Sequence, residues 1–277
     1  MLDGVIVIPC YNEAKRLNLA AFRHFARHMR SLRLLMVNDG SRDNTAELLD
    51  KLAREHAQIE ALHLSPNGGK AEAVRRGILH ACEQSPDFVG YLDADLATPL
   101  EEVPRFIDVL TRRDDVQVVI GSRMRLLGRN VRRRRLREFL GRSFALVASH
   151  VIGMPLRDTQ CGAKVFRVNE QLQAAFSEPF NSRWIFDVEI LARLKNGYQA
   201  AGLGDVSQVV YELPLDRWEE VPGSKLKSSD FVKAIGELYT IFWRYRWLGE
   251  VIPPQSSEDT AAAPESTPFQ REHRRAA

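Results

Sequence analysis

Short apolar segments that alternate with helix-like stretches fill the first 120 residues, and this alternation constrains the fold more than any other feature. Four segments are short and mostly apolar, as strands buried in a parallel sheet are. Between them, apolar residues recur every three or four positions, which predicts helices with one buried face. The four apolar segments are residues 5–8, 33–37, 88–92 and 116–120. Their alternation with helices predicts right-handed strand–helix–strand units in an open α/β sheet.

The chain beyond residue 157 shows the same kinds of pattern less regularly. Residues 163–168 and 206–213 are strand-like, and residues 185–198 predict an amphipathic helix that ends at a glycine. A last helix is expected from Asp230 to about Leu248, where aromatic residues are frequent.

The end of the chain differs in composition from the rest. The final 25 residues lack periodicity and are rich in Pro, Ser, Glu and Ala, which predicts disorder. We therefore expect a main domain over residues 1–228, a C-terminal amphipathic helix over 229–252 and a disordered tail over 253–277.

Composition excludes several classes of protein. The 277 residues are 44% apolar and 27% charged, which is unlike a disordered, collagen-like or membrane-embedded chain. Three widely spaced cysteines form no CxxC pair, so we expect a reducing compartment and neither a disulfide scaffold nor a four-cysteine zinc site. The acid Asp3 near the start argues against a signal peptide, and no run of 18 apolar residues is present. The sequence predicts a cytoplasmic protein, soluble or peripheral to a membrane.

Arginines are concentrated in one window of the sequence. Residues 121–142 hold nine arginines and one acid, Glu138, so the window carries +8, the whole chain +3 and the remainder −5. This asymmetry predicts an anionic partner at one place on the molecule. The nine are Arg123, Arg125, Arg129, Arg132, Arg133, Arg134, Arg135, Arg137 and Arg142.

The basic window runs into an uncharged apolar stretch. Together, residues 129–156 fit a segment that lies on an anionic membrane surface or collects an acceptor phosphate. An ordinary helix with a solvated basic face and a core face is the alternative. Nucleic acid is disfavoured because the window lacks interleaved aromatics and the rest of the chain is net acidic. The aromatic and basic residues 242–247 fit either a second interfacial contact or packing on the core.

Polar residues follow each of the four early strands, and a ligand site in an open α/β sheet lies beyond the carboxyl ends of its strands. Asp93 and Asp95 stand two residues apart, so both carboxylates can converge on one divalent cation. Mg²⁺ and Mn²⁺ combine few carboxylates with substrate phosphates, which predicts a metal that neutralises a diphosphate leaving group. The four polar segments are Pro9–Glu13, Asn38–Asp43, Asp93–Asp95 and Gly121–Arg123.

Six sequence blocks occur in the order of a known family. VIVIPCYNE, VNDGSRDNT, NGGKAEAVRRG, YLDADLATP, IGSR and DTQCGAKVF resemble the successive motifs of family 2 inverting glycosyltransferases, over residues 4–225. The blocks DTQCG, WIFDVE and RWEEVPGSK most resemble dolichyl-phosphate glucosyltransferases and related polyprenyl-phosphate sugar synthases. The resemblance implies the Rossmann-like GT-A fold, an α/β domain with a mixed, mainly parallel sheet flanked by helices and a C-terminal helical extension.

The resemblance also implies a donor site. Pro9, Tyr11 and Glu13 would line the base and ribose pocket, and Asp39 would bind the edge of uracil or guanine. Asp95 would ligate the metal directly, with Asp93 near the ribose or on the metal through water. Many mannosyl relatives carry a glutamine where this chain has Ala97, which weakens the case for a tightly held metal. The remaining donor residues implied are Ser41, Lys70, Ala94, Trp218 and Lys225, of which the last two belong to a loop that closes over the diphosphate.

The acceptor site follows from the same resemblance. Arg123 would meet a phosphate, since a guanidinium fork suits phosphate oxygens. The acceptor-binding set is Arg123, Arg129, Arg132, Arg133 and Gln160, and the catalytic set is Asp95, Arg123 and Asp187. Cys161 lacks an activating histidine and is interpreted as a small buried residue.

The chemistry of the acceptor decides the role of Asp187. A sugar hydroxyl needs a general base, for which Asp187 is the candidate, whereas a phosphomonoester is already a dianion and needs only positioning. The basic window favours the phosphate. We therefore predict inverting transfer of a hexose from a nucleotide sugar to a dolichyl or undecaprenyl phosphate. The expected donor is UDP-glucose, with GDP-mannose as the second choice. A soluble transferase with a hydroxyl acceptor and a non-catalytic nucleotide-sugar-binding protein are the alternatives.

Overall fold

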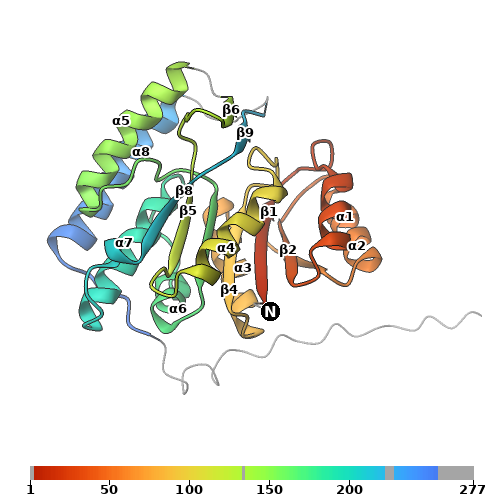
Figure 1. Cartoon of the computed structure of the whole chain (residues 1–277), viewed down its shortest axis with the longest axis horizontal. Coiled ribbons are helices and arrows are strands. Elements are labelled where there is room, and N and C mark those ends of the chain that lie inside the picture. Colours follow the sequence, from red (N-terminus) through yellow and green to blue (C-terminus); the bar gives the residue numbers. More distant parts are fainter. Residues whose placement is uncertain (1–2, 133–134, 222–227, 255–277) are drawn as a thin grey trace, which may run out of the picture.

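A seven-stranded sheet forms the centre of the protein, seen in a computed structural model that describes residues 3–132, 135–221 and 228–254 (Figure 1). The strand order is β3-β2-β1-β4-β7-β5-β8, and β7 alone in this sheet runs antiparallel to its neighbours, β4 and β5. The strands are β1 (Gly4–Cys10), β2 (Leu32–Asp39), β3 (Ile59–Leu64), β4 (Phe88–Leu92), β5 (Val118–Ser122), β7 (Ala163–Arg167) and β8 (Val210–Pro214). The expected mixed, mainly parallel α/β sheet is confirmed.

Helices cover both faces of this sheet, and each face has its own apolar core. On one face lie α1 (Leu19–His28), α2 (Thr45–Glu55) and α4 (Val103–Arg112), which follows the 3-10 turn η1 (Leu100–Glu102). The other face is covered by α3 (Lys70–Glu83), α5 (Arg135–Ile152), α6 (Glu170–Ser177), α7 (Phe186–Ala200) and α8 (Ser228–Ile241). The helices predicted from apolar spacing therefore form, because each buries its apolar face on the sheet.

The structure differs from the sequence predictions at several elements, and helix α6 was not predicted at all. Strand β3 was not predicted, because two of its six residues, Glu60 and His63, are polar and interrupt the apolar run, and it lies at the sheet edge. Within residues 206–213, a 3-10 turn η2 (Val206–Gln208) precedes β8. Helix α7 continues past Gly197, and most of its residues are buried, so it is a core helix and not an amphipathic one. The last helix changes at residue 242 into a π-helical segment, η3 (Phe242–Trp247).

The basic window forms part of a small second sheet. Strand β6 (Asn130–Arg132) pairs in parallel with β9 (Arg217–Glu219), and α5 begins shortly after β6. In the described ranges, none of the helices is both long and apolar enough to span a bilayer. The predicted tail lies outside the described residues from residue 255 onward.

Candidate active site

Side chains tie together the loops that follow β1 and β2, which are parallel neighbours whose carboxyl ends meet at one sheet edge. The backbone N–H of Asn12 donates to Ser41 Oγ at 3.0 Å, and the Asn12 side chain accepts from the Arg42 N–H at 2.8 Å. The N–H of Glu13 donates to Thr45 Oγ1 at 2.9 Å. Ser41 therefore shapes this loop pair, and Pro9, Tyr11 and Glu13 lie on the same edge.

Asp39 holds the loop that presents Lys70. Its buried carboxylate accepts from the N–H groups of Gly68 and Gly69, each at 2.8 Å, and from Asn67 Nδ2 at 2.7 Å. Gly69 has φ +89°, which a residue with a side chain rarely adopts, so a glycine suits this turn. Helix α3 begins at the next residue. Binding of a base edge by Asp39 remains a prediction.

Lys70 pairs with the first aspartate of the DxD motif. Its Nζ lies 2.5 Å from Asp93 Oδ1 and 5.6 Å from the centroid of the Phe186 ring, and both charged side chains are over one-third exposed. Burial alone would lower the pKa of Lys70, but the carboxylates of Asp93, Asp187 and Asp95 raise it. A cation paired with one exposed carboxylate, with two more carboxylates near it, is placed to meet a further anionic group that displaces Asp93.

The second aspartate of the motif is less exposed to solvent. Burial and the neighbouring Asp93 raise the pKa of Asp95, and the Asp95 carboxylate lies 3.7 Å from the Arg16 guanidinium. Two carboxylates that destabilise each other's charge fit a divalent cation, because Mg²⁺ and Mn²⁺ use one or two carboxylates and complete their shell with phosphates and water. The DxD pair fits a metal that completes its shell with substrate phosphates and water. No group of three or more His, Cys, Asp or Glu suited to a metal occurs in the described ranges.

Gly162 allows β7 to approach this motif. The N–H of Asp93 donates to the Gly162 carbonyl at 3.2 Å, and a Cβ at position 162 would stand 2.1 Å from Asp93 Oδ2. A side chain there would displace the Asp93 carboxylate, which explains the glycine of the DTQCG block. Ala94, between the two aspartates, is buried.

Arg123 is fixed by Asp158 at the end of β5. Nε and Nη2 of Arg123 donate to the two carboxylate oxygens at 2.7 and 2.6 Å, and the Trp218 ring lies 5.6 Å from the guanidinium. Burial would lower the pKa of Arg123, but Asp158 raises it, so the side chain stays charged. The bonds to Asp158 use Nε and Nη2, so among the described residues Nη1 of Arg123 is left for a ligand. Three buried polar atoms on adjacent residues have no partner in the described structure, Ser122 Oγ, Thr159 Oγ1 and Gln160 Nε2.

Asp187 lies beneath the site in a buried ion pair. Its carboxylate accepts from Lys164 Nζ and, at 2.5 Å, from the Tyr91 hydroxyl. Lys164 also donates to the carbonyls of Thr159 and Cys161, so it joins Asp187 to the DTQCG loop. Burial and the Asp187 charge raise the pKa of Tyr91, which stays a donor. Cys161 is buried as expected, and burial raises the pKa of its thiol to about 12.

Several arginines of the basic window pair with acids. Arg125 and Arg142 both pair with Glu138, which belongs to the window and is already included in its net charge of +8. Arg129 pairs with Asp216, and Arg132 lies 3.7 Å from Glu219. These last two acids stand on β9 or in the turn before it, so a count over the window alone does not include them. Arg133 and Lys225 lie outside the described residues.

Several residues of the site were not predicted from the sequence. Lys164, Tyr91, Asp158 and Arg16 contact the predicted aspartates and arginine. Lys164 could have been noticed, because it is a charged residue between apolar residues of a predicted strand, where a buried charge needs a partner. The other three gave no local pattern that marks them.

The fold and the strand-end site define a glycosyltransferase. Residues 5–172 match the model of the family Glycosyl transferase family 2, and the chain belongs to this family. It is a hexosyltransferase related to dolichyl-phosphate glucosyltransferases. A dolichyl-phosphate β-glucosyltransferase of Trichomonas vaginalis is 33% identical over 252 residues, 87% of this chain and 71% of that protein. The enzyme of the same name in Dictyostelium discoideum is 30% identical over 87% of this chain and 74% of its own length.

Solved structures confirm the GT-A fold. Glucosyl-3-phosphoglycerate synthase from Mycobacterium tuberculosis, in complex with Mn²⁺, UDP and glucosyl-3-phosphoglycerate, superposes with a TM-score of 0.61. The superposition covers 87% of this chain and 80% of the other, at 17% sequence identity. A second structure of that enzyme, with Mn²⁺ and UDP-glucose, has the same TM-score.

Proposed function

We propose that this protein transfers glucose from UDP-glucose to a polyprenyl phosphate such as dolichyl or undecaprenyl phosphate, with inversion. The relatives at about 30% identity are named for this reaction, and a structural neighbour binds UDP-glucose with Mn²⁺. The single observation that favours a phosphate over a hydroxyl acceptor is the state of Asp187. Its buried carboxylate already accepts from Lys164 and Tyr91, whereas a general base must reach the acceptor's proton.

The proposed reaction depends on positioning and charge. Asp95 and Asp93 would hold Mg²⁺ or Mn²⁺, which when bound supplies charge neutralisation to the departing diphosphate. Lys70 would move from Asp93 to a donor phosphate, and Arg123 would orient the acceptor phosphate through its free Nη1. A phosphate dianion held in line needs no proton removed before it attacks the anomeric carbon.

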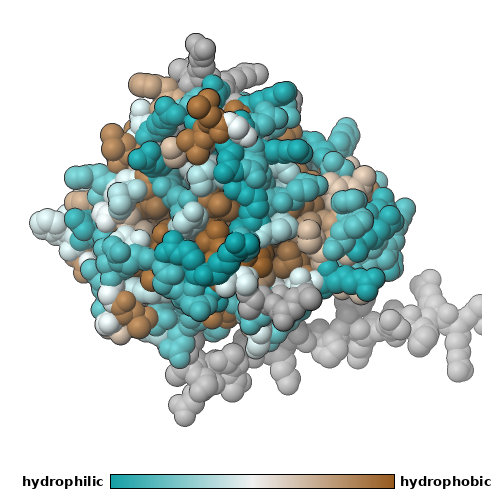
Figure 2. All heavy atoms as spheres, viewed as in Figure 1, coloured by the Kyte–Doolittle hydropathy of each residue, from teal (hydrophilic) through white to brown (hydrophobic). Residues whose placement is uncertain are grey.

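A peripheral location on the cytoplasmic face of a membrane is part of the proposal. Large apolar side chains are exposed on α5, α8 and η3, and Figure 2 shows hydrophobic surface over α5 at the upper left of the view. An exposed apolar surface of this kind fits a lipid interface. The side chains are Phe139, Leu140, Leu146, Val147, Ile235, Tyr239, Trp243 and Trp247.

Transfer of radiolabel tests the reaction directly. UDP-glucose and GDP-mannose, each with Mg²⁺ or Mn²⁺, are incubated with the protein and dolichyl or undecaprenyl phosphate. We expect a labelled lipid from UDP-glucose alone. Label from GDP-mannose alone would overturn the donor assignment, and donor hydrolysis without labelled lipid would overturn the acceptor assignment.

The Asp187→Asn variant separates the two acceptor chemistries. Loss of a general base costs about 10²–10⁴-fold in kcat with donor binding intact. We expect a smaller loss, about tenfold, because Asn keeps the size of the side chain and the acceptor needs no base. A loss of about a thousandfold or more in a folded variant would favour the hydroxyl acceptor.

A further inference from the structure

Two carboxylates accept the backbone N–H groups in the second half of the loop between α6 and α7, while Arg193 donates to the carbonyls of its first half. Five successive backbone N–H groups, those of residues 181–185, donate to Glu189 and Glu237. Glu189 accepts the first two, at 3.1 and 2.8 Å, and Glu237 accepts the next three, at 3.2, 3.1 and 3.2 Å. Hydrogen bonds to a charged acceptor are stronger than neutral ones, so these two side chains define where the second half of the loop lies.

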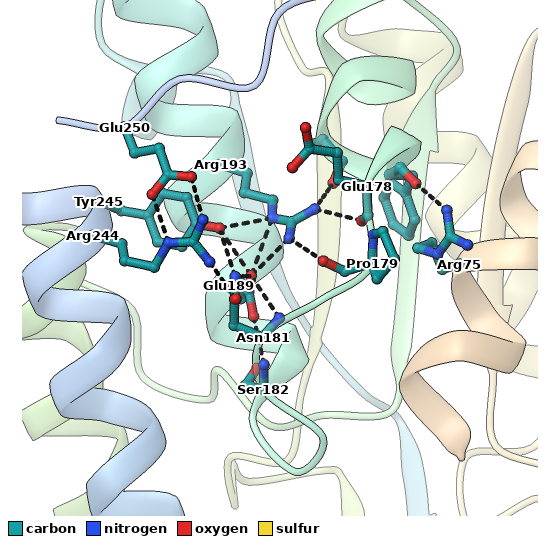
Figure 3. Close-up of polar contacts among 12 residues, drawn as sticks. Arg75, Glu178, Pro179, Asn181, Ser182, Glu189, Arg193, Arg244, Tyr245 and Glu250 are labelled. Carbon is teal, nitrogen blue, oxygen red and sulfur yellow. Dashed lines mark hydrogen bonds and ion pairs between the residues drawn. The ribbon is translucent and has the colours of Figure 1, made fainter. Parts of the chain in front are cut away.

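The two glutamates come from different elements. Glu189 belongs to α7 itself and is fully buried, where it also binds Arg193 and the Tyr245 hydroxyl (Figure 3). Glu237 belongs to α8, and the loop residues that it holds lie partly at the surface. Glu189 therefore anchors the loop to the core, and Glu237 alone of these two ties it to α8.

This loop leads directly into the candidate active site. Ile185, whose N–H is the last one held by Glu237, is the N-cap of α7. The next residue, Phe186, lies under Lys70, and the one after, Asp187, pairs with Lys164. A shift of the loop would move both contacts, because two residues of a helix start cannot move independently of their N-cap.

Helix α8 presents a different side to solvent. Ile235 and Tyr239 are both exposed and stand four residues apart, and the Tyr239 ring stacks with Trp243, which stacks in turn with Trp247. Residues four apart share one side of a helix, whereas Glu237 stands two residues from each of the first pair, on the opposite side. One helix thus joins an exposed aromatic stripe to the loop before Asp187.

We propose that Glu237 is a positioning residue through which contact of α8 and η3 with a lipid surface sets the placement of Phe186 and Asp187. This inference rests on the proposed function for its substrate, a lipid phosphate. A protein held on the lipid surface by the aromatic stripe has α8 fixed, and Glu237 passes that restraint to the loop. Charge and size at position 237 therefore affect turnover without any contact to the reacting atoms.

Two variants and a matched control test the proposal. Glu237→Ala removes both acceptor oxygens, Glu237→Gln keeps one, and Thr240→Ala changes an exposed residue of the same helix that bonds only within it. The N–H groups of Arg183 and Trp184 are at exposed positions, so water can replace the lost acceptor and the fold should persist. We expect kcat on anionic vesicles that contain the lipid acceptor to fall about 10- to 100-fold in Glu237→Ala, with the KM for the donor nearly unchanged. Gln should recover most of the loss, and the control should match the wild type.

Hydrogen exchange supplies a readout that needs no turnover. We expect anionic vesicles to slow amide exchange over residues 183–187 in the wild type and in Thr240→Ala, and to have less effect in Glu237→Ala. Two results would overturn the proposal. One is a kcat in Glu237→Ala equal to that of the wild type, and the other is amide exchange in the wild-type loop that vesicles do not slow. If no variant transfers sugar, the proposed function fails, and the exchange result alone still decides the coupling. If Glu237→Ala does not fold, the Gln variant and the wild-type exchange decide it.

Discussion

Two lysine–aspartate pairs in this molecule have the same chemistry and opposite surroundings. At the sheet edge, the Lys70 and Asp93 side chains are 40% and 36% exposed. Below them, between β7 and α7, those of Lys164 and Asp187 are 0% and 5% exposed. An exposed pair contributes about 0–1 kcal/mol and exchanges partners with water or a ligand at little cost. A buried pair holds its geometry, since breaking it leaves a charge without solvent.

The difference separates what binds substrate from what supports it. The loops after β1, β2 and β4 place exposed charges where a donor and a metal can reach them. The later segments supply buried ion pairs and fixed loops, in which Asp187, Glu189 and Arg193 are already engaged. We therefore expect changes in the first region to reduce activity at constant stability, and changes in the second to reduce stability first.

Removal of the buried lysine has the largest expected effect. Lys164→Met leaves the Asp187 carboxylate buried without its cation, and the free energy of unfolding should fall by about 3–5 kcal/mol. Urea unfolding followed by circular dichroism measures this change. The double variant Lys164→Met/Asp187→Leu removes both charges and should recover part of the loss. If Lys164→Met is as stable as the wild type, the buried pair does not stabilise the fold.

Removal of the exposed lysine should reduce activity and leave stability nearly unchanged. Lys70→Ala takes away a cation aimed at the diphosphate, and kcat/KM should fall about 10²- to 10³-fold, as for loss of one electrostatic stabiliser of a transition state. Thermal unfolding should change little, because the pair with Asp93 is exposed. Steady-state kinetics and calorimetry on the same sample measure both. A drop in stability with unchanged kinetics would show that the Lys70–Asp93 pair supports the fold and does not bind substrate.

A side chain at position 162 should disturb the exposed pair alone. Gly162→Ala places a Cβ 2.1 Å from Asp93 Oδ2, so the carboxylate must turn away, and kcat/KM should fall about tenfold. Gly197→Ala on α7 is the matched control, because its Cβ would meet nothing within 4 Å. The control should keep full activity and gain about 0.5–1 kcal/mol from better helix propensity. Equal activity in both variants would contradict the close approach at Asp93.

Acid should weaken the buried region gradually. Burial raises the pKa of Glu189, but Arg193 and the N–H groups of Asn181 and Ser182 outweigh it, so the pKa lies below its ordinary value of 4.5. A lowered folded-state pKa gives stability that is present above pH 4.5 and is lost as pH falls through the lowered pKa. Urea midpoints at several pH values measure this loss. The urea midpoint should change less with pH in Glu189→Gln than in the wild type. An equal change in both proteins would show that other groups cause the loss of stability in acid.

Local patterns were enough to predict the early half of the fold. Strand β3 was not predicted, because Glu60 and His63 interrupt its apolar run without producing a strict alternation of apolar and polar residues. Helix α7 appeared amphipathic because Asp187, Glu189 and Arg193 are charged, and all three are buried with partners. Periodicity assigns charged residues to solvent, so it fails wherever charges are paired inside.

The sequence by itself determined the strand–helix alternation, the polar strand ends and the DxD pair, because each depends on residues only a few positions apart. The tertiary structure decided which charges are free. It brought Asp216 and Glu219 to the basic window, Lys164 to Asp187, and Glu237 to the loop before α7. These partners stand between 23 and 87 residues apart, and an ion pair at such separation exists only once the chain has folded around it.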